Sequence, residues 1–382
     1  MIPTPTTNAR LPFVLADFAT LAEGLDYAAQ GETGYNFYSL KGEVIETLPY
    51  RDLRERARDL AQKLSGLGVP RHGRAAILAE TVADFHVFFF ACQYAGLLPV
   101  PLPLPINLGG RDAYIDQIRQ MMQRAQASVA VSSTALVDIL KEACSVMPGV
   151  EAGSFADFAA LPGAGADLNP LGADEPCYIQ FSSGSTSAPK GVTATQKSAM
   201  SNIPAILQHG LQCRQGDRAA SWLPLYHDMG LVGFALAPAM MQVTIDYLST
   251  SDFARRPLLW PRLISENGSS LGFSPSFGYE LCARRARSGA PETFDLSTWR
   301  VAGIGGDMVR ADVLDAFVDT FAPMSFRRSA FIPSYGMAEA TLAITFAEPD
   351  VPFERDTVDL QAYAGSGVAK PVGGEVEARK RR

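Results

Sequence analysis

Short apolar segments alternate with longer amphipathic segments along most of this chain of 382 residues. A helical pattern follows each apolar segment within a few residues, and a strand that returns through a helix pairs in parallel with its predecessor. The alternation therefore predicts an α/β protein whose mostly parallel sheets are flanked by helices. The segments with strand character are 74–79, 127–133, 177–182, 218–223, 270–274, 300–305 and 329–334.

A passage rich in glycine, alanine and proline, residues 161–176, interrupts this pattern near the middle of the chain. Such a composition favours a linker over a helix or a strand. We therefore expect a first α/β subdomain over residues 1–170 and a second over residues 171–347.

The longest apolar run begins at Val87 and reads VFFFACQYAGLLPVPLPLP. Four prolines between Pro99 and Pro105 argue against a membrane-spanning helix, because proline removes a helical hydrogen bond and clashes with the preceding turn. The run predicts a buried helix from Ala83 that ends at Gly96, then a strand and a loop, with no stable membrane insertion.

Charge and cysteine content narrow the class of protein further. A formal net charge of −7 argues against a protein that binds the phosphate backbone of nucleic acids. The five cysteines show neither a CxxC pair nor metal-ligand spacing, which favours a reducing compartment, and the N-terminus lacks an apolar signal segment. We expect a cytoplasmic protein without a nucleic-acid partner.

The stretch FSSGSTSAPKG, from Phe181 to Gly191, follows one predicted strand and combines hydroxyl groups, glycine and a lysine. Successive backbone N–H groups and hydroxyls suit phosphate oxygens, and Lys190 adds a cation. A Walker phosphate loop is disfavoured, because Lys190 is followed by Gly191 and a further strand pattern instead of Ser or Thr and a helix. Taken alone, the stretch would favour an ordinary surface loop rich in serine and glycine.

Three more loops with polar residues follow predicted strands: WLPLYHDMGLVG from Trp222, GIGGDM from Gly303 and IPSYGMAEAT from Ile332. Each loop also has a purely structural explanation. In the first loop His227 would be a structural histidine, in the second Asp307 would cap the N-terminus of a helix, and in the third Glu339 would lie in the first turn of a helix. Ligands of parallel α/β folds bind at the carboxyl ends of strands. The four loops together therefore predict one ligand site.

These loops resemble those of the large N-terminal domain of the adenylate-forming enzymes, and within that superfamily the chain most resembles the fatty acyl-AMP ligases. SSGSTSAPKG is similar to the phosphate loop of the superfamily, and YGMAE to its Tyr-Gly-x-x-Glu motif. The contexts LPLYHDMGL and YGMAEATL favour the fatty acyl-AMP ligase branch, and the resemblance extends over residues 48–342. It implies a layered αβαβα fold with two interleaved subdomains.

The resemblance also implies roles for individual residues. The phosphate loop would hold the β- and γ-phosphates of ATP, and Glu339, with Thr186, would hold Mg²⁺. His227 would lie near the acyl carboxylate, and Thr341 near the α-phosphate. The implied catalytic residues are His227, Glu339 and Lys190. The implied nucleotide-binding residues are Ser182, Ser183, Gly184, Ser185, Thr186, Ser187, Gly305, Gly306, Asp307, Ser334, Tyr335, Gly336, Met337 and Thr341. Residues on segments suited to lining an acyl slot are Phe234, Met240, Phe273 and Phe277.

By this resemblance the chain would activate a fatty acid as acyl-AMP, with release of pyrophosphate, for transfer to an acyl carrier protein of a polyketide, nonribosomal or lipid pathway. A fatty acyl-CoA ligase and a non-catalytic module that binds acyl-adenylate are the alternatives. Ser187 stands where the family usually has glycine. Residues 348–382 would begin the insertion of this branch, and the small C-terminal domain with its catalytic lysine would lie outside this sequence. We therefore expect this chain alone to be weakly active or inactive.

Overall fold

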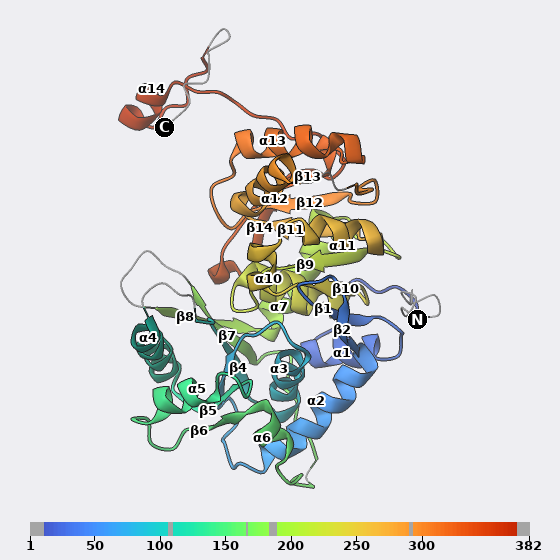
Figure 1. Ribbon diagram of the computed structural model, residues 1–382. Coiled ribbons are helices and arrows are strands. Elements are labelled where there is room, and N and C mark those ends of the chain that lie inside the picture. The colour runs from blue at the N-terminus through green and yellow to red at the C-terminus, as the bar shows by residue number, and fades with distance from the viewer. Residues whose placement is uncertain (1–10, 106–109, 166, 183–188, 290–292, 373–382) are drawn as a thin grey trace.

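A computed structural model describes residues 11–105, 110–165, 167–182, 189–289 and 293–372, and in these residues the strands form three sheets (Figure 1). The larger sheet has eight strands in the order β14-β13-β12-β11-β9-β10-β1-β2, and a smaller one has the order β4-β3-β5-β6. A hairpin of β7 and β8 is the third. The strands are β1 (Gly34–Tyr38), β2 (Val44–Pro49), β3 (Arg74–Leu78), β4 (Leu98–Leu102), β5 (Ala127–Ser132), β6 (Glu151–Ser154), β7 (Pro176–Ser182), β8 (Lys190–Thr195), β9 (Arg218–Ser221), β10 (Thr244–Tyr247), β11 (Leu271–Ser274), β12 (Val301–Ile304), β13 (Phe331–Gly336) and β14 (Ala343–Phe346).

Helices cover the sheets, and two of the described segments, η1 and η2, are π-helices. Figure 1 shows α12 and α13 packed over the β12 end of the larger sheet and α4 and α5 over the smaller sheet. The helices are α1 (Leu21–Ala28), α2 (Tyr50–Ser65), α3 (Ala83–Ala95), α4 (Gly110–Ala125), α5 (Val137–Cys144), α6 (Phe155–Ala159), α7 (Gln196–Pro204), η1 (Ala205–Gly210), α8 (Asp228–Gly230), η2 (Leu231–Leu236), α9 (Ala237–Met240), α10 (Thr250–Arg255), α11 (Leu259–Asn267), α12 (Ser276–Ser288), α13 (Ala311–Phe321), η3 (Ala322–Met324), η4 (Arg328–Ala330), η5 (Ala338–Ala340) and α14 (Leu360–Ser366).

Pairing within the sheets confirms the predicted α/β class. Strands β9 to β13 pair in parallel, as do all strands of the smaller sheet. Antiparallel strands occupy both edges of the larger sheet, where β2 pairs with β1 and β14 pairs with β13. Each predicted strand segment contains an observed strand, and the ends differ by one or two residues at most positions.

The prediction of a crossover helix after segment 329–334 is wrong. One short turn, η5, follows β13, and the chain then returns as the antiparallel strand β14. The backbone of Gly336 approaches that of Leu342 so closely that the two strands form a tight turn in place of a crossover helix. The alternative role of Asp307 as a helix N-cap is also wrong, because α13 begins four residues later, after Arg310.

The long apolar run behaves as its prolines predicted. It forms α3, which Gly96 ends in a left-handed conformation with φ of 73°, followed by the buried strand β4. Nearly every side chain of α3 is buried, as expected of a helix packed between layers rather than on a surface. Among the described residues, no helix is both long and apolar enough to cross a membrane.

Sheet membership does not follow the predicted division at residue 170. The first half contributes β1 and β2 to the larger sheet, where β1 pairs with β10 more than 200 residues later. The boundary between subdomains therefore stays a prediction, and the segments before and after it are interleaved in space.

Candidate functional site

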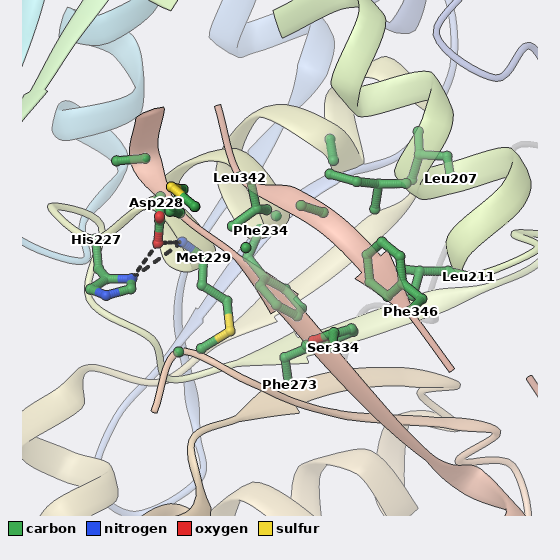
Figure 2. Close-up of a pocket in the computed structure, with 18 of the residues that line it drawn as sticks. Leu207, Leu211, His227, Asp228, Met229, Phe234, Phe273, Ser334, Leu342 and Phe346 are labelled. Carbon is green, nitrogen blue, oxygen red and sulfur yellow. Dashed lines mark hydrogen bonds and ion pairs between the residues drawn. The ribbon is translucent and has the colours of Figure 1, made fainter. Parts of the chain in front are cut away.

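A cavity of about 310 Å³ opens where β7, β12 and β13 end, with the π-helices η1 and η2 along its sides. Figure 2 shows His227 and Asp228 toward one end and Leu207, Leu211 and Phe346 toward the other, with Phe234 and Phe273 between them. One end is polar and the other apolar. The cavity thus suits a ligand with a charged head and a hydrocarbon tail.

The polar end is organised around His227. Its Nδ1 lies 2.7 Å from Oδ1 of Asp228, a side chain that is 12% exposed. Because Nδ1 faces Asp228, Nε2 is the ring nitrogen left to meet a ligand. The backbone N–H of Met229 also donates to the Asp228 carboxylate, at 2.7 Å, and so fixes the carboxylate that orients the ring.

The pKa of His227 is raised above its ordinary value, although burial acts against the charged ring. Burial is the largest single influence and lowers the pKa, but the hydrogen bond to Asp228 and the charge of Asp228 together outweigh it. The site therefore favours the imidazolium form of His227, in which both ring nitrogens donate.

Gln180 fixes the backbone that leads into His227. This residue is 2% exposed and lines the cavity, and its Nε2 donates to the carbonyl of Tyr226 at 3.1 Å. The Gln180 Oε1 atom is buried without a hydrogen-bond partner among the described residues. A buried unpaired acceptor is costly, which is typical of a site that a ligand or a water completes.

Two π-helices shape the apolar part of the cavity. π-Helices are rare and occur mostly at functional sites. After η2, Pro238 has no N–H to offer the carbonyl of Phe234 four residues earlier, and the buried hydroxyl of Tyr247 donates to that carbonyl instead. The Tyr35 hydroxyl donates to the next carbonyl, that of Ala235, at 2.5 Å. Buried tyrosines of β1 and β10 therefore hold the helix that presents Phe234 to the cavity.

The turn after β13 borders the mouth of the cavity. Tyr335 is 59% exposed, so one large ring face is available to a ligand. Thr341 has φ of 72°, a conformation that is strained for a β-branched residue. Strain of this kind concentrates at functional sites, and here it folds the turn back so that Glu339 faces the mouth.

Glu339 is an exposed carboxylate that lines the cavity mouth. The described residues contain no group of three or more His, Cys, Asp or Glu side chains that could hold a metal ion by themselves. A single carboxylate could hold Mg²⁺ only together with oxygens of a ligand, because this ion is usually held by one or two carboxylates together with substrate phosphates.

Many of the predicted site residues meet at this cavity. The predicted residues that line it are Ser182, His227, Phe234, Phe273, Gly306, Ser334, Tyr335, Gly336, Met337 and Glu339. The predicted residues that lie outside its lining are Lys190, Met240, Phe277, Gly305, Asp307 and Thr341. The predicted phosphate-loop residues that fall outside the described part of the chain are Ser183, Gly184, Ser185, Thr186 and Ser187.

Physical reasons account for the residues that lie elsewhere. Met240 is fully buried and packs against Gly24 of α1, and its neighbour Met241 lines the cavity instead. Phe277 is 48% exposed and lies edge-on to Trp222. Asp307 accepts a hydrogen bond from the N–H of Ser276 at the start of α12, behind the cavity.

Sequence reasoning missed several lining residues, among them Gln180, Leu207, Leu211 and Phe346. A glutamine inside the apolar strand CYIQFS was a usable signal, because buried amides need a specific partner. The aliphatic and aromatic residues have the pattern of ordinary core positions, so no signal in the sequence distinguished them.

Comparison with known proteins places these features in a family. The profile described as AMP-binding enzyme matches residues 28–375. A protein of Caulobacter vibrioides, provisionally named an acyl-CoA synthetase, is 49% identical over 96% of this chain and 64% of its own length. A medium-chain fatty acid–acyl-carrier-protein ligase of Moorena producens is 31% identical over 86% of this chain and 56% of its own.

A solved structure from work on the fatty acyl-adenylate ligases of E. coli and L. pneumophila is 40% identical, with a TM-score of 0.92, and covers 96% of this chain and 66% of that one. A ligase of L. pneumophila in complex with acyl adenylate and pyrophosphate, at 24% identity and a TM-score of 0.80, shares the fold over 92% of this chain and 62% of its own. The chain thus spans less than two thirds of the length of these relatives.

Proposed function

This chain belongs to the AMP-binding enzyme family, and on that premise we propose that it joins a fatty acid to the α-phosphate of ATP, with release of pyrophosphate, to form acyl-AMP. The observation that carries the proposal is the two-ended cavity. A cation-favouring histidine, an exposed tyrosine and an exposed carboxylate lie toward its mouth, and its interior is apolar. Similarity to fatty acyl-adenylate ligases supports a fatty acid over an amino acid as the substrate.

In this reaction the protein must position two anions, the fatty acid carboxylate and ATP, and offset the charge at the phosphoryl centre. His227 donates from Nε2 to the carboxylate of the fatty acid, while Asp228 holds the opposite ring nitrogen. Tyr335 stacks on the adenine ring, and Ser334, Gly306 and Gly336 border the base. Phe234 and Phe273 contact the acyl chain.

Glu339 holds Mg²⁺ in this proposal, together with the phosphates of ATP. A bound ion would supply neutralisation of charge on the phosphate oxygens. The contribution of the chain is the placement of Glu339 by the turn after β13. The predicted participation of Thr186 and of the other phosphate-loop residues, as well as of Lys190, remains part of the proposal.

Calorimetric titration with acyl-sulfamoyl adenosines tests the proposal, because these analogues occupy an adenylate site without turnover. We expect the lauroyl analogue to bind at least 100-fold more tightly than the phenylalanyl analogue, because a long apolar slot rewards each buried methylene. The Tyr335→Ala variant should bind it roughly tenfold more weakly, through loss of stacking. The matched control is Tyr363→Ala, which removes a similarly exposed tyrosine (56%) of α14, outside the cavity lining.

ATP–pyrophosphate exchange supplied with the same two acids separates catalysis from binding alone. Exchange that depends on the fatty acid supports the ligase. Tight binding of the lauroyl analogue without any exchange favours the non-catalytic acyl-adenylate-binding module, and preference for the amino acid overturns the fatty-acid assignment.

We further propose that an acyl carrier protein accepts the acyl group, as the name of the Moorena producens relative states for that ligase. Transfer to CoA is the second candidate, favoured by the name of the Caulobacter vibrioides relative. Incubation of the loaded protein with CoA or with a holo-carrier protein decides between them by the thioester that forms.

The five cysteines are all free and buried, which supports the expected reducing, cytoplasmic location.

A further inference from the structure

The apolar end of the cavity is closed by residues from two elements far apart in sequence. Leu207 belongs to η1, Leu211 follows it, and Phe346 is the last residue of β14 (Figure 2). We call these three residues the end wall. Leu207 and Leu211 are buried, whereas Phe346 is half-buried, so part of this side chain also reaches solvent.

The ring of Phe346 packs directly on the backbone of η1. A Cβ atom at Gly210 would lie 2.5 Å from this ring, closer than real Cβ contacts allow. Glycine at this position therefore lets the aromatic ring lie flat against the helix. The strand that carries Phe346 is fixed as well, because the Asn202 amide pairs with both the N–H and the carbonyl of Ala343, at 3.1 and 2.8 Å.

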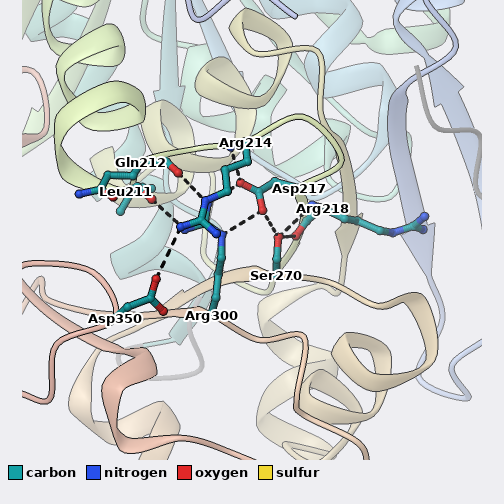
Figure 3. Close-up of polar contacts among 8 residues, drawn as sticks. All are labelled: Leu211, Gln212, Arg214, Asp217, Arg218, Ser270, Arg300 and Asp350. Atoms are coloured by element: carbon teal, nitrogen blue, oxygen red, sulfur yellow. Dashed lines mark hydrogen bonds and ion pairs between the residues drawn. The ribbon is translucent and has the colours of Figure 1, made fainter. Parts of the chain in front are cut away.

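Leu211 is held in place from behind. The guanidinium of Arg300 donates to the carbonyl groups of Leu211 and Gln212, at 3.0 and 3.1 Å, and forms a buried ion pair with Asp217 (Figure 3). Asp217 also accepts from Ser270 at 2.6 Å. The loop that begins with Leu211 is thus fixed by charged hydrogen bonds on its outer side, which makes the end wall rigid rather than pliable.

We propose that the end wall limits the length of the acyl chain that the cavity accepts, with Phe346 as the residue that sets the limit. The inference rests on the proposed function, in which the acyl carboxylate binds at His227. A chain that enters there runs past Phe234 and Phe273 and meets Phe346. A cavity of about 310 Å³ is at the small end of the range for ligand pockets, and its polar end is shared with the adenylate, so the proposed substrate is a fatty acid of limited length.

The test is a calorimetric series of acyl-sulfamoyl adenosines whose acyl groups lengthen by two carbons at a time. For the wild-type protein we expect each added methylene to tighten binding by about fourfold until the chain reaches the end wall, and then no further gain. For Phe346→Ala the gain should continue for at least one more two-carbon step, which makes the first analogue beyond the wild-type limit bind about fifteenfold more tightly than it binds the wild-type protein.

Two companion variants keep the result interpretable. Phe346→Leu retains an apolar side chain over Gly210 and should shift the limit in the same direction by a smaller amount. Phe353→Ala, which truncates another half-buried phenylalanine of the same C-terminal segment, lies outside the cavity lining and should leave the limit unchanged. Near-ultraviolet circular dichroism checks that each variant is folded.

The outcomes separate this inference from the proposed function. A folded Phe346→Ala protein whose length limit equals that of the wild type overturns the role of Phe346 and leaves the ligase assignment standing. Failure of the wild-type protein to bind any fatty acyl analogue overturns the ligase assignment, and the inference that depends on it. A longer limit in both Phe346 variants, with none in the control, is the expected result.

Discussion

The pKa of His227 is governed by burial, which lowers it, and by the Asp228 carboxylate 2.7 Å away, which outweighs burial and raises it. A histidine with a raised pKa stabilises the fold below the ordinary value of 6.5, and this contribution is lost as the pH rises through the raised pKa. The charge at the polar end of the cavity therefore depends on Asp228.

Asp228→Asn should lower the pKa of His227 below its ordinary value, since burial then acts without an opposing carboxylate. The measurement is an NMR titration of the His227 ring protons. Asp295→Asn, at an exposed turn, is the matched control and should leave that titration unchanged. An unaltered His227 titration in Asp228→Asn would show that the pair does not form in solution.

Gly336 illustrates how a motif glycine can be required by packing alone. A Cβ atom there would lie 1.8 Å from the carbonyl oxygen of Leu342, a backbone atom that has no room to move. Gly336→Ala should therefore cost about 3 kcal/mol or more in the free energy of unfolding, by forcing β13 and β14 apart. Urea denaturation measures the loss.

The control for that substitution is Gly365→Ala in α14, where nothing lies within 4 Å of the added methyl group. This variant should keep or slightly raise stability, because alanine favours a helix. Equal stability of both alanine variants would contradict the close approach at Gly336.

At the scale of whole elements, the buried pair of Arg300 and Asp217 anchors the loop between η1 and β9. Arg300→Met leaves the Asp217 carboxylate buried without its cation, and we expect a loss of about 3–5 kcal/mol in the free energy of unfolding. Arg111→Met breaks the exposed pair with Glu142 and should change stability little. Urea denaturation measures both losses. Equal losses in the two variants would contradict the expectation that breaking the buried pair destabilises the protein more than breaking the exposed one.

Strong periodic elements were predictable from sequence, and elements defined by their partners were not. The helix from Ala83 to Gly96 and the strand at 74–79 have unmistakable apolar runs and formed as predicted. In contrast, most side chains of β2 are exposed, so this edge strand lacks the alternation that identifies a half-buried strand. β14 exists because Gly336 permits a tight turn, a tertiary fact that propensity does not contain.

The same distinction holds at the site. Loops after β9 and β13 were identifiable because His227, Tyr335 and Glu339 are polar or aromatic residues at strand ends. Leu211 and Phe346 reach the cavity only through the packing of η1 against β14, and their residue types are those of any core. The chemistry of the candidate site was therefore more visible in the sequence than the shape of its apolar end.

For the molecule as a whole, acid stability depends on a histidine outside the cavity lining. His86 of α3 is 1% exposed, its Nε2 has no partner among the described residues, and the rings of Tyr35, Phe37, Phe85 and Tyr247 surround it. Burial lowers its pKa to about 3. The unfolded chain therefore binds a proton at pH values where the folded protein does not.

The sign of the effect follows directly. Stability is unaffected by His86 above its unfolded pKa of 6.5 and falls as the pH drops from there toward 3. At pH 4 the loss should reach about 3 kcal/mol. His86→Phe should remove this loss of about 3 kcal/mol from the difference in unfolding free energy between pH 7 and pH 4. The control His209→Phe, at an exposed position, should leave that difference unchanged.

The parallel pairing of β1 with β10 has a consequence for how the protein is made. Residues 34–38 emerge early in synthesis, but their partner, residues 244–247, is translated some 200 residues later. Until β10 has been synthesised, β1 lacks this pairing partner. Contacts so distant in sequence also form slowly, because the entropy of closing a long loop is lost before the contacts stabilise the chain. During that interval β1 and β2 present an open strand edge of the kind that invites aggregation. Because β1 pairs with β10 so late, we expect folding of this protein during synthesis to depend on chaperones.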